Sequence, residues 1–137
     1  MSNQNLSIPL ADWKNMQQHV AALAPEEACG LLAGKDCRVS QHFAIENELH
    51  SYNRFRMEAQ AQLNAFLRME KLNIDLLAYY HSHPTGKGEP SATDLAEFLY
   101  PDVFMLIWYQ QDDIWQAKAW SIEEKSYSPV IIEIIES

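Results

Sequence analysis

Residues 76–95 read LLAYYHSHPTGKGEPSATDL, and this stretch predicts a strand, a loop and a helix in succession. The apolar run Leu76–Tyr80 is typical of a buried strand, and it leads directly into His81-Ser82-His83-Pro84. Because proline cannot donate to a strand ladder, the strand is expected to end there, with its histidines at an edge or mouth of the sheet. A loop with two glycines follows, and Ser91–Leu99 predicts a short helix.

Three side chains of this stretch are suited to binding a metal ion. His81 and His83 are two residues apart, and in an extended strand such residues point to the same face, so both imidazoles can converge on one point. Asp94 lies in the first turn of the predicted helix, and the loop is long enough to fold it back over the histidines. Two neutral imidazoles and one carboxylate are the ligand set of many catalytic zinc sites. The pattern therefore predicts one zinc ion per chain.

A hydrolytic zinc site also needs a base and a donor for the oxyanion. Ser91, roughly one helical turn before Asp94, is a candidate donor, and Glu26 and Glu27 are candidate bases. Each motif alone has a plainer interpretation. Ser91-x-x-Asp94 is a helix-capping motif, His-x-His before proline is common in surface turns, and adjacent glutamates fit a solvated face. Their coincidence favours the metal site.

The rest of the chain predicts a single domain over residues 1–137, of the α/β or α+β class, with a central sheet and flanking helices. Apolar residues at helical spacing cover Leu6–Ala24 and Phe55–Lys71. Strands are expected at Gly30–Gly34, Cys37–Ile45, Leu76–Tyr80, Val103–Tyr109, Ile114–Ile122 and Val130–Ile135.

The composition is typical of a cytoplasmic globular protein. Of the 137 residues, 47% are hydrophobic, which is enough for one core. No apolar run is long enough to span a membrane, and Met1–Leu10 lacks the features of a secretory signal. The formal net charge of −9 opposes binding to nucleic acid. Cys29 and Cys37 are too few for a disulfide framework and are expected to be buried or half-buried.

The same residues resemble a known family. His81-Ser82-His83-Pro84, six residues, Ser91, two residues and Asp94 match the signature of the JAMM (MPN-plus) metalloproteases without a gap. The segment Glu27-Ala28-Cys29-Gly30-Leu31-Leu32-Ala33-Gly34 is similar to the family's upstream block, and the resemblance extends over nearly the whole chain. It implies that Glu27, rather than Glu26, is the general base. It also implies that His81, His83 and Asp94 are zinc ligands and that Ser91 helps to bind the tetrahedral intermediate.

The fold implied by this resemblance is a curved mixed sheet flanked by helices, similar to that of cytidine deaminases. The implied activity is zinc-dependent hydrolysis of a peptide or isopeptide bond by a metal-activated water. Short stand-alone bacterial members look most similar, and they imply a substrate at the C-terminus of a ubiquitin-like or sulfur-carrier protein. The alternative is a non-catalytic binding scaffold of the same fold, which the intact ligand set disfavours. A zinc deaminase is disfavoured because neither His-x-Glu nor Pro-Cys-x-x-Cys occurs.

Two arginines are weaker candidates for binding substrate. Arg54 and Arg56 lie just before or within the start of the second predicted helix, where a guanidinium can bind a main chain or a carboxylate. A solvated cationic pair on an acidic surface is an equally good interpretation. The remaining histidines are expected to be core or surface residues; they are His19, His42 and His50. The oligomeric state stays open.

Overall fold

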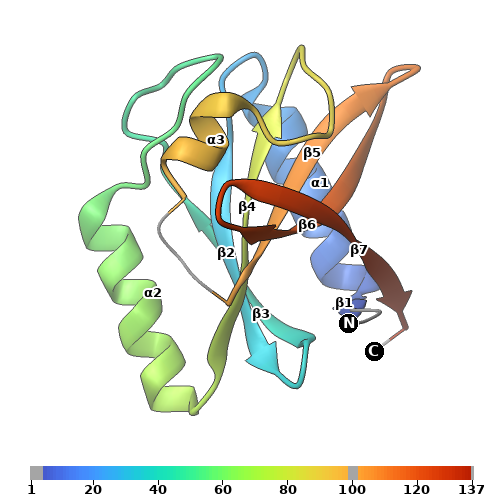
Figure 1. Cartoon of the computed structure of the whole chain (residues 1–137). Helices are drawn as coiled ribbons and strands as arrows, with labels where there is room; N and C mark the ends of the chain where they lie inside the picture. Colours follow the sequence, from blue (N-terminus) through green and yellow to red (C-terminus); the bar gives the residue numbers. More distant parts are fainter. Residues whose placement is uncertain (1–4, 99–101, 137) are drawn as a thin grey trace.

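The strands of this chain curl into a closed, mixed barrel, and the helices pack against its surface (Figure 1). The computed structural model describes residues 5–98 and 102–136. The elements, in chain order, are β1 (Asn5–Pro9), α1 (Leu10–Leu23), β2 (Cys29–Lys35), β3 (Arg38–Ile45), α2 (Ala59–Leu72), β4 (Asp75–His83), α3 (Ala92–Ala96), β5 (Phe104–Gln111), β6 (Ile114–Glu123) and β7 (Ser126–Ile135).

The barrel closes through the first and last strands. Its strand order is β1-β3-β2-β4-β5-β6-β7, and β7 pairs in parallel with β1 from Asn5 opposite Ile131 to Pro9 opposite Ile135. The sheet is mixed, since β4 and β5 are also parallel whereas β2 is antiparallel to both β3 and β4. The expectation of a curved mixed sheet with flanking helices is confirmed. The sequence did not predict that the sheet closes into a barrel. The expected likeness to cytidine deaminases stays a prediction.

The first predicted helix is wrong at its N-terminus. Residues 5–9 form β1, and α1 begins only at Leu10. Leu6 and Ile8 alternate with more exposed neighbours and are fully buried, which is the period of a strand. β1 pairs with β3 at Ser7 and, over its whole length, with β7, more than a hundred residues further along the chain, so no local pattern reveals the pairing with β7.

The other two helices also differ from the sequence prediction: α2 starts later, at Ala59, and α3 ends earlier, at Ala96. The N-cap of α2 is Glu58, whose carboxylate accepts hydrogen bonds from the backbone of Gln60 and Ala61, so residues 55–57 lie outside the helix. The N-cap of α3 is Ser91, and the predicted last residue of this helix, Leu99, lies outside the described residues. Within the described ranges, no helix has the length and apolar character needed to cross a membrane.

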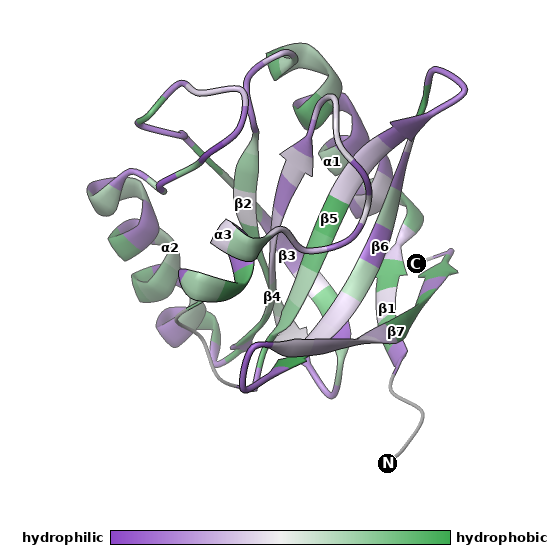
Figure 2. Cartoon of the chain, turned by 45° about the horizontal axis from the view of Figure 1, so that its top comes forward, coloured by the Kyte–Doolittle hydropathy of each residue, from purple (hydrophilic) through white to green (hydrophobic). Residues whose placement is uncertain are grey.

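Apolar side chains gather in two clusters on opposite faces of the central strands. Met16 and Val20 of α1 pack in one cluster with Tyr80, and Ala65 and Met69 of α2 pack in the other with Tyr79. The central strand β5 is hydrophobic along much of its length (Figure 2), in agreement with the burial of residues 105–108. Because successive residues of β4 face opposite ways, His81 and His83 share the face that α2 covers.

Candidate metal and catalytic site

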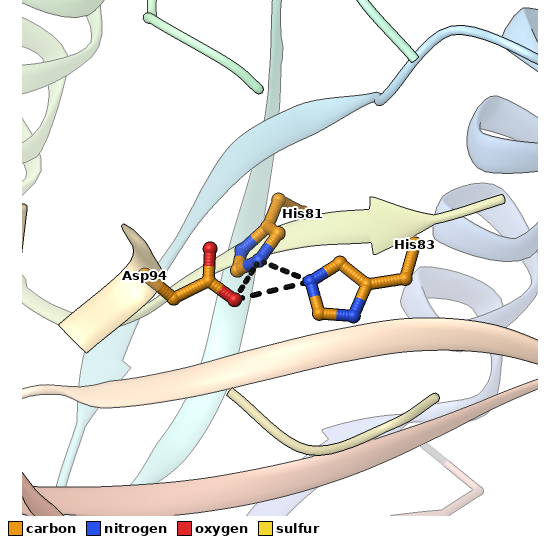
Figure 3. Close-up of side chains that lie close together, drawn as sticks. All are labelled: His81, His83 and Asp94. Carbon is orange, nitrogen blue, oxygen red and sulfur yellow. Dashed lines mark hydrogen bonds and ion pairs between the residues drawn. The ribbon is translucent and has the colours of Figure 1, made fainter. Parts of the chain in front are cut away.

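Three donor atoms converge at the end of β4, as the sequence predicted (Figure 3). His81 Nε2 lies 3.2 Å from His83 Nε2, and Asp94 Oδ2 lies 3.1 Å from the first and 3.0 Å from the second. Around a tetrahedral zinc with bonds of 2.0–2.2 Å, neighbouring ligand atoms stand about 3.3 Å apart. The triangle therefore has the size that one small metal ion requires. It is a possible metal site made by two imidazoles and a carboxylate.

Strand β4 is paired on both sides at His81 and with β5 at His83. His81 stands opposite Cys29 of β2 and opposite Ile107 of β5, and His83 stands opposite Tyr109. Asp94 comes from α3, which the loop after Pro84 folds over the end of the strand. The two imidazoles are thus fixed by the sheet, and the carboxylate is fixed by the first turn of a capped helix.

Contacts outside the triangle orient the two imidazole rings. His83 donates from Nδ1 to the carbonyl of Lys87 at 2.6 Å, which leaves the lone pair of Nε2 facing the other donors. The ring of His81 is fully buried and stacks on Phe55, with ring centroids 4.6 Å apart and planes 21° apart. Its Nδ1 is buried and has no hydrogen-bond partner among the described residues.

Asp94 and His81 favour the protonation states in which they can bind a cation. Burial by itself raises the pKa of Asp94, but hydrogen bonds with His81 and His83 outweigh it and hold that pKa well below its usual range. Burial lowers the pKa of His81, which favours the neutral imidazole. Burial also opposes the charged form of His83, but Asp94 and the Lys87 carbonyl outweigh it and raise the pKa of that ring. A carboxylate that stays ionised beside two imidazoles is completed electrostatically by a divalent cation.

The backbone around Glu27 is held on several sides. Glu27 lies in the loop between α1 and β2, where its N–H donates to the carbonyl of Ser51 at 2.7 Å. Its carbonyl accepts from the side chain of Asn47 at 3.0 Å. The next residue, Ala28, is bound to Ser82 of β4 through its N–H, at 2.8 Å, and its carbonyl, at 3.0 Å. These bonds tie Glu27 to the strand that carries the histidines.

Glu27 and Glu26 lie in very different surroundings. Glu27 is 4% exposed, and its Oε1 is buried without a hydrogen-bond partner in the described part of the chain. Burial, opposed by His83 and assisted by Asp94, raises the pKa of Glu27 to about 8. A cation at the nearby donors would lower this pKa again. Glu26, by contrast, is paired at the surface with His50. The structure thus brings Glu27, and not Glu26, beside the predicted metal ligands.

Ser91 has the two properties that sequence analysis treated as alternatives. Its Oγ accepts a hydrogen bond from the N–H of Asp94 at 3.0 Å, and its own N–H donates to Asp94 Oδ2 at 2.9 Å, which completes a capping box. A hydroxyl that accepts one bond still has its own proton to donate. Ser91 is exposed, so capping the helix leaves this proton available to a bound molecule.

A cleft of about 400 Å³ opens beside Asp94. The predicted substrate-binding residues Arg54 and Arg56 both line it, and each is in an ion pair, Arg54 with Glu97 at 2.7 Å and Arg56 with Glu48. The lining residues are Leu49, Asn53, Arg54, Phe55, Arg56, Met57, Gln62, Tyr79, Thr93, Asp94 and Glu97. Whether the arginines bind substrate stays a prediction. Phe55 and Asn47 also lie near the site, and no local sequence motif marks either residue.

The other polar residues singled out in the sequence lie away from the three donors. His19 and His42 are half-buried and both hydrogen-bond the hydroxyl of Tyr80, whereas His50 is exposed. Both cysteines are free. The expectation that they are buried or half-buried holds for Cys29 and is wrong for Cys37, which is exposed in the turn between β2 and β3.

Comparison with known proteins finds relatives over most of the chain. A family model described as prokaryotic homologues of the JAB domain matches residues 10–123. The desampylase of Pyrococcus furiosus is 31% identical over 107 residues, which are 78% of this chain and 74% of that protein. The CysO-cysteine peptidase of Mycobacterium tuberculosis is 31% identical over 94 residues, 67% of this chain and slightly less than two thirds, 64%, of that protein.

Solved structures share the fold over nearly the whole chain. A solution structure from Desulfitobacterium hafniense superposes with a TM-score of 0.86 at 26% identity, and it covers 96% of this chain and 94% of that one. A JAB1/MPN domain protein from Archaeoglobus fulgidus superposes with a TM-score of 0.61 and covers 96% of this chain and 97% of that one. At 17% identity, this second likeness concerns the fold alone.

Proposed function

Because this chain belongs to the family of prokaryotic homologues of the JAB domain, we propose that it is a metal-dependent hydrolase of protein conjugates. Its substrate is a peptide or isopeptide bond at the C-terminus of a ubiquitin-like or sulfur-carrier protein. The names of the relatives support this class, since one is a desampylase and another a CysO-cysteine peptidase. The single observation on which the chemistry depends is the triangle of His81, His83 and Asp94 with Glu27 buried beside it.

Zinc is the metal that this donor set fits best. Two neutral imidazoles and one carboxylate leave a coordination position open, as catalytic zinc sites require. The distances of 3.0–3.2 Å between the donor atoms support a single ion per chain. Zinc bound there supplies a Lewis acid and lowers the pKa of a water molecule toward ~7.

The protein's own residues then move the protons. Glu27 removes a proton from the attacking water as its oxygen bonds to the scissile carbonyl carbon, and returns the proton to the departing amine nitrogen when the C–N bond breaks. The carboxyl group of Glu27 holds the proton between these two steps. The hydroxyl of Ser91 donates a hydrogen bond to the carbonyl oxygen as negative charge develops on it.

The cleft beside Asp94 is suited to the substrate chain. Its wall combines the apolar side chains of Phe55 and Met57 with the guanidinium groups of Arg54 and Arg56. An extended segment leading to the scissile bond offers apolar side chains and backbone carbonyls, and a wall of this composition can bind both. Because Asp94 belongs to the same cleft, the bound segment ends at the predicted metal.

The proposal is tested by cleavage of a defined substrate. The protein is incubated with zinc and a ubiquitin-like sulfur-carrier protein that has one extra C-terminal amino acid, and with the same carrier joined to a lysine side chain. Mass spectrometry is expected to show hydrolysis of at least one of them, and hydrolysis at least about 10²-fold slower in a Glu27→Gln variant. Binding of both carriers without cleavage by the zinc-loaded wild type would contradict the proposal and favour a scaffold.

A further inference from the structure

Asn47 lies two residues after the end of β3 and makes hydrogen bonds with every polar atom of its side chain. The residue is 3% exposed. Its Nδ2 donates to the carbonyls of Glu27 and Arg54, both at 3.0 Å. Its Oδ1 accepts from the N–H of Leu49 at 3.1 Å and of Arg56 at 3.0 Å. A carboxamide has two protons to donate and one oxygen that accepts two bonds, so this side chain is fully satisfied.

The four bonds connect two parts of the proposed site. One reaches Glu27, the proposed base, and two reach the backbone of Arg54 and Arg56 on the wall of the cleft. These parts are far apart in the sequence, and Asn47 is a side chain that touches both. Two more contacts join the loop after α1 to the segment after Asn47: the N–H of Glu27 donates to the carbonyl of Ser51, and the exposed His50 pairs with Glu26.

The loop from Asn47 to Met57 is closed at its base. Asn47 and Met57 form an isolated antiparallel bridge, and the N–H of Glu48 donates to the carbonyl of Arg56 at 2.9 Å. Next to the bridge, the N–H of Glu58 donates to the carbonyl of Glu46 at 2.9 Å. The backbone therefore holds the ends of the loop together, whereas the Asn47 side chain fills its interior and joins it to Glu27.

We propose that Asn47 is a positioning residue that sets the place of Glu27 relative to the cleft in which the substrate lies. This inference rests on the proposed function. A proton acceptor must stand within hydrogen-bond reach of the attacking water, and a misplacement of 1 Å can lower a rate by about 10²-fold.

Two substitutions of Asn47 remove its donor groups. Aspartate keeps the two contacts in which the Asn47 oxygen accepts and loses both contacts in which the nitrogen donates. Serine is uncharged but too short to reach both carbonyls.

The test compares Asn47→Asp with Asn64→Asp. The control makes the same chemical change on the exposed face of α2, where the Asn64 side chain accepts only from Gln60 among the contacts described. We expect kcat to fall about 10- to 100-fold in Asn47→Asp and to stay within about twofold in Asn64→Asp. Zinc content is expected to stay the same in both, because none of the hydrogen bonds described for Asn47 involves a predicted metal ligand. Amide exchange at Glu27 is expected to be at least about tenfold faster in Asn47→Asp alone.

Making Asn47→Asp in a Glu27→Gln variant as well as in the wild type separates an effect on the position of Glu27 from a general loss of structure. If Asn47 acts through Glu27, Asn47→Asp lowers the residual kcat of a Glu27→Gln variant by less than about threefold, because effects of residues that act as a unit do not add. The inference would be overturned if Asn47→Asp lowered kcat by the same factor in the wild type and in the Glu27→Gln variant. It would also be overturned if Asn47→Asp changed neither kcat nor the amide exchange at Glu27. Asn47→Ser is measured in parallel, and it replaces the aspartate variant if that chain does not fold.

Failure of this inference is distinguishable from failure of the proposed function. If the zinc-loaded wild type cleaves no carrier, the proposed function is wrong, and the exchange measurement still reports whether Asn47 holds Glu27. If the wild type cleaves and the two aspartate variants have equal kcat, the function stands and the role of Asn47 is wrong.

Discussion

Glu27 lies across from His83 when the pairing of β2 with β4 is extended by two residues. Cys29 stands opposite His81 in this antiparallel pair, and the same register continued toward the end of β4 brings Glu27 opposite His83. The electrostatic influence of His83 and Asp94 on the pKa of Glu27 agrees with this proximity. The predicted base lies two residues before β2, and the two hydrogen bonds of Ala28 with Ser82 link it to the strand that carries the predicted histidine ligands.

The first prediction concerns the base. Glu27→Gln keeps the size of the side chain but cannot accept the proton of the water, so kcat is expected to fall by about 10²- to 10⁴-fold. Metal content is expected to stay unchanged. The matched control is Glu26→Gln, one residue earlier and exposed in an ion pair with His50. Steady-state kinetics and elemental analysis of both variants decide the assignment, which is wrong if Glu26→Gln is the more damaging change.

The sequence was most informative where the site is local. His81, His83 and Asp94 lie within one strand, loop and helix, so strand alternation and helix capping were enough to predict their convergence. The choice of Glu27 over Glu26 came from the family resemblance, because the distance from either glutamate to the histidines depends on a pairing between separate strands. Asn47 was missed for the same reason: its partners lie as far as twenty residues away. Closure of the barrel through β1 and β7 has no local signature at all.

The second prediction concerns the metal. Purified protein is expected to contain about one zinc per chain, and His83→Ala is expected to lose it, because removal of one of three ligands leaves too few to hold the ion. Asp94→Asn is expected to weaken binding by removing the negative charge. His50→Ala, at an exposed site distant in sequence, serves as the control. Elemental analysis checks the three variants, and equal zinc in His83→Ala and wild type would refute the ligand set.

The third prediction separates the two roles of Ser91. Ser91→Ala removes both the N-cap and the proposed oxyanion donor, so it is expected to cost about 1 kcal/mol of stability and about 10²-fold in kcat. Ser91→Thr keeps a hydroxyl and is expected to retain most of both. Ser91→Asp keeps a capping oxygen but has no proton to donate. Activity in Ser91→Asp equal to wild type would show that Ser91 acts only as a cap.

The fourth prediction concerns the cleft. Arg54→Ala is expected to raise KM several-fold with little change in kcat, because a residue on the cleft wall holds substrate without touching the reacting atoms. Stability is expected to change by less than about 1 kcal/mol, since the ion pair of Arg54 with Glu97 is exposed. Arg68→Ala on α2, outside the cleft, is the control. Equal KM values for Arg54→Ala, Arg68→Ala and wild type would assign Arg54 to the solvated surface.

The fifth prediction concerns stability in mild acid. The hydroxyl of Tyr80 lies 2.6 Å from His19 Nδ1 and 2.7 Å from His42 Nε2, on the face of the sheet opposite the metal ligands. Burial, followed by the influence of His19, lowers the pKa of His42 from 6.5 to about 4. Burial lowers the pKa of His19 as well and raises that of Tyr80 well above its usual range, so the native cluster is neutral near pH 7.

The lowered pKa of His42 means that the free energy of unfolding decreases as the pH falls. The unfolded chain binds a proton at this histidine near pH 6.5, whereas the folded chain binds it only near pH 4, so unfolding takes up a proton between these values. The contribution to the free energy of unfolding is complete above pH 6.5 and is lost as the pH falls to about 4, by at most about 3 kcal/mol. This contribution is measured by denaturant unfolding of the wild type and of His42→Gln across this pH range, at the same zinc concentration. Since the metal ligands titrate alike in both, their effect cancels in the difference. The variant is expected to have the flatter pH profile, and parallel profiles would mean that His42 does not titrate in this way.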